Sequence, residues 1–117
     1  MRPFAVSFLF LSLSLGIVAR SAFSFENDGS VWFKGTIEGA FSAAKTESKP
    51  LMVYWGAVWC PPCNELKANV FSKPRFAELM KPLIAAYLDG DQPDAQFWSD
   101  KLGVSGYPTV VLYDKDG

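Results

Sequence analysis

One feature limits the possible folds of this chain more than any other. It is a buried-strand pattern that is followed almost directly by two closely spaced cysteines. Residues 51–57 read LMVYWGA, an uncharged run rich in β-forming side chains, as in strands that are covered on both faces. Pro61 suits the first turn of a following helix, because an N–H at that position would have no intrahelical partner. The pattern therefore predicts that Cys60 lies where a strand ends and a helix begins, with Cys63 one turn further on.

Helix and strand patterns alternate along the rest of the chain, whose 117 residues allow one domain. Thr36 is placed to cap a helix whose apolar side chains recur at helical spacing, and Gly103 is placed to end a later one. The other predicted elements are helices at residues 75–83 and 94–102 and strands at residues 84–88 and 109–113. All three strands are apolar enough to need cover on both faces. Strands that are separated by helices favour parallel pairing in a layered α/β fold.

The placement of the two cysteines predicts redox chemistry. Cys63 shares a helix face with Leu66 and Val70, so it is expected to be the more buried thiol. Cys60 is expected at the helix N-terminus, where free backbone N–H groups and the helix dipole favour a thiolate. A thiolate at Cys60 can attack a disulfide, and Cys63 is close enough to resolve the mixed disulfide that forms.

Composition excludes several other kinds of chemistry. The chain has no histidine, which removes Ser-His and Cys-His nucleophile pairs and most metal sites. A net charge of −1 provides no basic surface for nucleic acid or for an anionic membrane. We therefore expect no metal, no organic cofactor and no nucleic-acid partner.

Three alternatives to a redox pair follow from the residues. A structural zinc site needs about four nitrogen or sulfur ligands, and the chain has two thiols and no imidazole. An inert pair of buried cysteines fits poorly with the neighbouring Trp59 and the two prolines between the thiols. A structural disulfide between residues three positions apart would close a loop too small to constrain much chain entropy. A redox pair is favoured over all three.

The N-terminal segment has the pattern of a secretory signal peptide. Arg2 precedes an apolar stretch at residues 4–18, and small residues that suit cleavage follow it. We expect residues 1–24 to be the signal peptide and residues 25–117 the mature domain. An uncleaved membrane anchor is the alternative, although the stretch is shorter than the roughly 20 residues that a spanning helix needs. The protein is therefore expected to be exported, periplasmic if bacterial and secreted otherwise, and to meet a membrane only transiently.

Two separated motifs make the chain resemble the thioredoxin family. Residues 53–63 read VYWGAVWCPPC and residues 103–112 read GVSGYPTVVL, in the order and spacing of that family. The segment at residues 43–54, AAKTESKPLMVY, is similar to the exported thioredoxin-like domains of bacterial disulfide reductases. The resemblance covers residues 32–117 and implies a thioredoxin-like α/β fold, in which helices flank a central mixed sheet.

The resemblance also implies roles for individual residues. Cys60 would be the attacking thiol and Cys63 the resolving thiol, with Trp59 as the aromatic side chain that shields the pair. Pro108 would be a cis-proline whose loop faces the two sulfurs, and Tyr107 before it would offer backbone contacts to the substrate. An ordinary trans turn is the alternative for these last two residues.

Two departures from the family pattern affect the proton chemistry and the extent of the domain. Many members carry a buried acid six positions before the first cysteine, where this chain has Tyr54, and a lysine on the next strand, where we expect Ala85. The proton of Cys63 would then move through water or through Glu65. The family fold also continues past the turn at Gly117 with one more strand and a C-terminal helix, so we expect both to be missing here.

These observations together predict an exported protein-disulfide oxidoreductase that exchanges disulfides with protein substrates and with a redox partner protein. The absence of a histidine between Cys60 and Cys63 favours a reductase, with an oxidase or an isomerase as open alternatives. A redox-inactive module that binds peptides or a partner through the same groove is the alternative from another class of function. Trp55 and Trp98 are expected to be core or surface side chains and not substrate contacts.

Overall fold

The chain folds into alternating helices and strands, as the sequence patterns predict. The computed structural model describes residues 30–117, so the predicted signal peptide and its junction with the mature domain lie outside the described residues. The elements, in chain order, are α1 (Ile37–Glu47), β1 (Leu51–Gly56), α2 (Pro61–Leu66), a π-helical turn η1 (Lys67–Phe71), α3 (Pro74–Met80), β2 (Ile84–Asp89), α4 (Ala95–Leu102) and β3 (Thr109–Tyr113). Within residues 30–117, no helix is long and apolar enough to cross a membrane.

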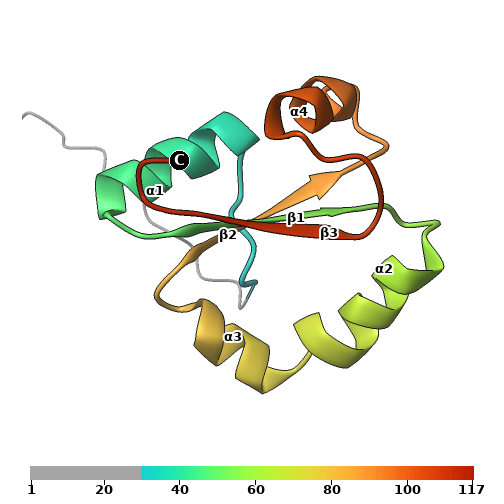
Figure 1. Cartoon of the computed structure of the whole chain (residues 1–117). Helices are drawn as coiled ribbons and strands as arrows, with labels where there is room; N and C mark the ends of the chain where they lie inside the picture. Colours follow the sequence, from blue (N-terminus) through green and yellow to red (C-terminus); the bar gives the residue numbers. More distant parts are fainter. Residues whose placement is uncertain (1–29) are drawn as a thin grey trace, which may run out of the picture.

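A three-stranded mixed sheet in the order β2-β1-β3 forms the centre of the molecule (Figure 1). β1 runs parallel to β2 and antiparallel to β3. The prediction of parallel pairing is therefore wrong for β3, while the mixed sheet implied by the family resemblance is confirmed. Trp55 of β1 pairs with Leu88 near the end of β2 and with Thr109 at the start of β3. Because α4 joins two points at the same end of the sheet, β3 has to run back along β1.

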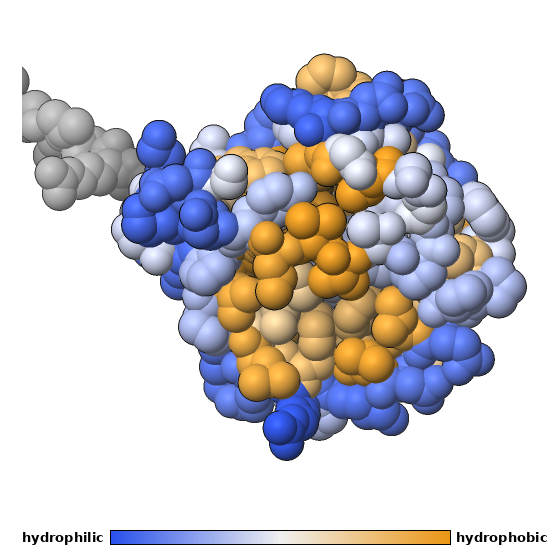
Figure 2. Space-filling model, viewed as in Figure 1, coloured by the Kyte–Doolittle hydropathy of each residue, from blue (hydrophilic) through white to orange (hydrophobic). Residues whose placement is uncertain are grey.

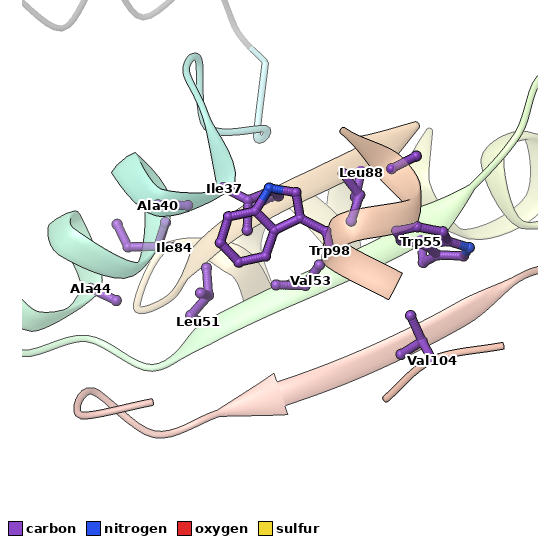
Figure 3. Packing of buried hydrophobic residues seen from close by; sticks show 12 residues of the cluster. Ile37, Ala40, Ala44, Leu51, Val53, Trp55, Ile84, Leu88, Trp98 and Val104 are labelled. Atoms are coloured by element: carbon purple, nitrogen blue, oxygen red, sulfur yellow. The ribbon is translucent and has the colours of Figure 1, made fainter. Parts of the chain in front are cut away.

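Helices cover both faces of the sheet, with α1 and α4 on one side and α2 and α3 on the other (Figure 1). Since the side chains of a strand alternate between its faces, Val53 and Trp55 pack with Trp98 and the apolar side of α1 (Figure 3). Met52 and Tyr54 point to the opposite face, towards η1 and α3. All of β1 is buried, which explains its uncharged sequence. Trp55 and Trp98, which were expected to be core or surface side chains, both lie in the core.

β3 is an edge strand with one open face. Burial alternates along it, and Val110 and Leu112 are 48% and 66% exposed. Apolar surface accordingly occupies the middle of the view in Figure 2, which shares the orientation of Figure 1. Among the described residues, β3 therefore lacks on one face the cover that its apolar sequence needs. The further strand and helix expected by family resemblance concern residues after Gly117 and stay a prediction.

The start of α1 and the end of α4 follow the predicted capping residues, whereas α3 ends at Met80 and not at residue 83 as predicted. The hydroxyl of Thr36 accepts a hydrogen bond from the N–H of Gly39 at 3.1 Å and so caps α1. Gly103 ends α4 with a φ of 67°, a left-handed conformation that a residue without a Cβ adopts at little cost. Both boundaries were therefore readable from single residues next to an apolar helical pattern.

The π-helical turn changes which side chains after α2 face the core. A π turn contains more residues than an α turn, so the side chain that faces the core comes later in the sequence than α-helical spacing predicts. Val70 is consequently 43% exposed, whereas Phe71 packs against the buried cluster that contains Cys63. The prediction that Val70 shares an inner face with Cys63 and Leu66 is therefore wrong for Val70.

Candidate active site

The junction between β1 and α2 places both cysteines at the start of a helix. Cys60 is the N-cap residue of α2, and Pro61 occupies the first helical position, where no N–H is needed. The sulfur of Cys60 accepts a hydrogen bond from the N–H of Cys63 at 3.3 Å. The two side chains are joined by a disulfide, with their Cα atoms 5.2 Å apart. The structure thus brings the predicted pair together at the predicted junction.

The two cysteines differ in their access to solvent. Cys63 is fully buried, while Cys60 is 3% exposed, so the prediction that Cys63 is the more buried residue is confirmed. Trp59, the neighbour of Cys60, is 61% exposed. Another sulfur approaching from solvent therefore reaches Cys60 first, along the surface beside Trp59. A thiolate at Cys60 would also be stabilised by the hydrogen bond that its sulfur accepts from the N–H of Cys63.

The second motif meets the first through an aromatic stack. The ring of Tyr107 lies parallel to that of Trp55, with centroids 5.6 Å apart, and the ring of Trp59 meets it edge-on at 5.5 Å. Trp59 is held in turn by a hydrogen bond that its indole N–H donates to the carboxylate of Asp91 at 3.0 Å. The peptide bond between Tyr107 and Pro108 is cis.

An apolar groove lies between α2 and Pro108. It has a volume of about 690 Å³ and is open to solvent. Its lining residues are Pro61, Pro62, Glu65, Leu66, Asn69, Val70 and Pro108. The groove therefore begins at the residues that immediately follow Cys60 and ends at the proline of the second motif.

The strand neighbour of Tyr54 differs from the one predicted. Tyr54 pairs in register with Tyr87 of β2, and Ala85 pairs with Met52. The expectation that Ala85 stands beside Tyr54 is therefore wrong by two positions along β2. A shift of two keeps the same face of the strand, which is why the apolar pattern did not reveal it.

Two tyrosines line the buried side of the site, and both stay protonated. Burial raises the pKa of Tyr54. Burial, followed by the nearby charge of Asp89, raises the pKa of Tyr87 to about 12. Neither phenol can therefore act as a base near neutral pH. The other predicted proton acceptor, Glu65, is exposed, and its carboxylate accepts a hydrogen bond from the Asn69 amide at 2.8 Å.

Sequence reasoning missed two residues of the site, Asp91 and Tyr87. A signal for both was present, because parallel strands end at the same edge of a sheet. Residues that follow β2 are then expected to meet residues that follow β1, as Asp91 meets Trp59. Aligning β1 with β2 from their first residues would also have paired Tyr54 with Tyr87.

Gly90 packs so closely against Tyr107 that a side chain does not fit there. A Cβ at Gly90 would collide with the hydroxyl end of the Tyr107 ring. The ring cannot move aside freely, because Trp55 and Trp59 hold it on two sides. We expect Gly90→Ala to lower the free energy of unfolding by about 1–3 kcal/mol, measured by urea denaturation.

Gly106→Ala is the matched control for this substitution, since a Cβ there meets no atom within 4 Å. In a Tyr107→Ala background, Gly90→Ala should lower the free energy of unfolding by much less, as expected for two residues in direct contact. A Gly90→Ala variant as stable as the Gly106→Ala variant would contradict this packing.

Comparison with known proteins identifies the family to which this fold and site belong. A family profile described as thioredoxin-like matches residues 32–115. A thioredoxin from Thermus thermophilus is 27% identical and superposes with a TM-score of 0.60, covering 69% of this chain and 62% of that chain. A putative disulphide-isomerase from Bacteroides thetaiotaomicron is 25% identical with a TM-score of 0.61, covering 74% and 72%. The chain belongs to the thioredoxin-like family.

Two further relatives are much longer than this chain. Protein disulfide-isomerase 1 of Dictyostelium discoideum is 33% identical over 76 residues, which are 64% of this chain and 21% of that protein. Thiol:disulfide interchange protein DsbD of Photorhabdus laumondii is 30% identical over 71 residues, which are 59% of this chain and 12% of that protein. This chain therefore spans only a minor part of the length of either relative.

Proposed function

We propose that this chain is a protein-disulfide oxidoreductase that works through Cys60 and Cys63. The observation that carries the proposal is the disulfide between them at the start of α2, beside the groove that ends at Pro108. A disulfide across three positions constrains little chain entropy, so a structural role explains it poorly. The names of two relatives, a disulfide isomerase and a thiol:disulfide interchange protein, support the same chemistry.

Cys60 is the proposed attacking thiol and Cys63 the proposed resolving thiol. In the dithiol form, the Cys60 thiolate attacks a substrate disulfide, a mixed disulfide forms, and one substrate sulfur leaves as a thiolate. The Cys63 thiolate then attacks the sulfur of Cys60, which closes the internal disulfide and releases the second substrate sulfur as a thiolate. The substrate gains two electrons and this chain loses two. A partner protein with a dithiol returns the electrons by the reverse sequence.

Trp59, Tyr107 and Pro108 are the proposed substrate contacts. The groove between α2 and Pro108 offers an extended segment of a substrate a path next to Cys60. Trp59 offers an exposed apolar surface whose position is held by its hydrogen bond to Asp91. A side chain that is already held in place loses little conformational entropy when it binds.

We further propose that the protein is exported and acts as a reductase. Export is supported by the signal-peptide pattern of residues 1–24, which would place the protein in the periplasm of a bacterium or outside another cell. The reductive direction is supported by the absence of a histidine between the two cysteines. Its substrates would then be protein disulfides that form in that oxidising compartment.

The test is catalysed reduction of insulin disulfides by dithiothreitol, with the thiol-alkylated protein as the control. We expect the unmodified protein to accelerate the reaction and the alkylated protein to leave it at the rate of dithiothreitol alone. A reduction potential near that of thioredoxin, about −270 mV, supports a reductase, whereas about −180 to −120 mV indicates an isomerase or an oxidase. Peptide binding without acceleration would replace the proposal with a redox-inactive binding module.

A further inference from the structure

Two buried hydroxyl groups have no hydrogen-bond partner in the described part of the chain. They belong to Tyr54 and Tyr87, and they are the buried side-chain oxygen or nitrogen atoms of residues 30–117 that remain unpaired. A buried polar group without a partner is destabilising, so each such case in a native fold calls for a physical reason.

The two tyrosines form one unit on the face of the sheet that α2 covers. Tyr54 of β1 and Tyr87 of β2 are register partners, and their rings stack with centroids 5.2 Å apart and planes 19° from parallel. Trp32 and Phe71 pack around them, with ring centroids 5.8 Å and 4.7 Å from that of Tyr54. Aromatic side chains therefore surround the pair, Lys67 and Ser72 line the same pocket beside it, and neither hydroxyl is hydrogen-bonded to any of these neighbours.

The same unit packs directly around the redox pair. Tyr54, Ala57, Cys60 and Cys63 form one buried cluster, and Tyr87 packs against it. The hydroxyl end of Tyr54 lies over Gly56, where an added Cβ would collide with it. The Tyr54 side chain therefore extends along β1 towards the end of the strand from which the two cysteines follow.

The redox state of Cys63 decides whether its sulfur needs a hydrogen-bond donor. In the disulfide, the sulfur of Cys63 is uncharged and bonded to Cys60. When the disulfide opens, Cys63 becomes a fully buried thiolate, which needs hydrogen-bond donors because it has left water. The raised pKa of Tyr54 keeps its phenol protonated and therefore able to donate.

We propose that the Tyr54 hydroxyl donates a hydrogen bond to the sulfur of Cys63 in the dithiol form, and that the Tyr87 hydroxyl supports it by donating to the Tyr54 oxygen. The proposal rests on the proposed function. In the step concerned, a thiolate of a dithiol attacks the sulfur of Cys60, the bond between Cys60 and Cys63 breaks, and its electron pair passes to Cys63. The hydroxyl of Tyr54 stabilises this leaving thiolate and keeps its own proton.

A consequence for the redox equilibrium follows directly. The unpaired hydroxyls destabilise the disulfide form, and their pairing stabilises the dithiol form. Both effects favour reduction of this chain. Removing the hydroxyl of Tyr54 is therefore expected to shift the equilibrium towards the disulfide, since Phe fills the same space without an unpaired oxygen.

The experiment is equilibration of the full chain with mixtures of reduced and oxidised dithiothreitol, read by trapping the free thiols. We expect Tyr54→Phe to lower the equilibrium constant for reduction about tenfold, which corresponds to a potential about 30 mV more negative. Tyr87→Phe should shift it in the same direction by less. Tyr113→Phe is the control, because Tyr113 packs in the other core, beside α1, and should leave the constant unchanged.

Unfolding of both redox forms separates this role from simple packing. Tyr54→Phe should leave the disulfide form as stable as the unmodified chain, or more stable, and should weaken the dithiol form. An equilibrium constant that Tyr54→Phe leaves unchanged, or an equal loss of stability in both redox forms, would overturn the proposed hydrogen bond. Exchange of the wild-type chain with dithiothreitol would still support the redox pair in that case. A wild-type chain that fails to exchange at all would instead overturn the proposed function.

Discussion

Replacing Cys60 with serine is expected to abolish catalysed disulfide exchange, leaving insulin reduction at the uncatalysed rate. The thiolate is the nucleophile in this chemistry, and a serine hydroxyl does not ionise at neutral pH. Cys60 is also the member of the pair with any exposure to solvent. Cys63 cannot substitute for it, because that residue is fully buried behind Cys60 at the start of α2.

Cys63→Ser is the matched variant, and it should fail in a different way. Cys60 still attacks a substrate disulfide in this protein, but no second thiol releases the substrate. A covalent complex between Cys60 and the substrate should therefore accumulate, visible as a species on a non-reducing gel that dithiothreitol removes. Full turnover by both variants would show that the cysteines are not the reacting groups.

Trp98→Ala is expected to have the largest effect on stability, a loss of about 3–5 kcal/mol in the free energy of unfolding. The Trp98 side chain is 2% exposed and lies between α1 and β1 (Figure 3). Its ring also stacks against that of Phe41. A typical domain is stable by only about 5–15 kcal/mol, so this single truncation should remove a large part of the total. Urea unfolding followed by circular dichroism measures the loss.

Phe97→Ala provides the control from the adjacent position of the same helix. Phe97 is 57% exposed, so its truncation leaves no buried cavity and should change the free energy of unfolding by less than about 1 kcal/mol. Equal effects of the two variants would mean that α4 does not present Trp98 to the core.

Much of the candidate site could be predicted because its parts are local in sequence. The position of Cys60 at the start of α2 follows from an uncharged strand, a short loop and Pro61, all within about ten residues. The deeper burial of Cys63 follows from helical spacing alone. Asp91 was not predictable in this way, since it reaches Trp59 across 32 positions of sequence.

The pairing of Tyr54 with Tyr87 shows where local patterns stop being informative. Ala85 and Tyr87 lie on the same face of β2, so the alternation of side chains alone does not decide which of them is the neighbour of Tyr54. The register between β1 and β2 distinguishes them, and that register is a property of the folded sheet. The same limit applies to Val70 and Phe71. Phe71 faces the core in place of Val70 because of a π-helical turn, which helical periodicity does not reveal.

The sequence by itself determined the order of the helices and strands, several of their ends and the junction that holds the cysteines. These features depend on interactions within a turn or a strand, such as the cap at Thr36 and the left-handed stop at Gly103. Only the tertiary structure decided the antiparallel direction of β3, the tyrosine pair behind Cys63 and the contact of Asp91 with Trp59. Each of these depends on how distant segments align, and the free energy of that alignment comes from packing the whole core, which no short window of sequence contains.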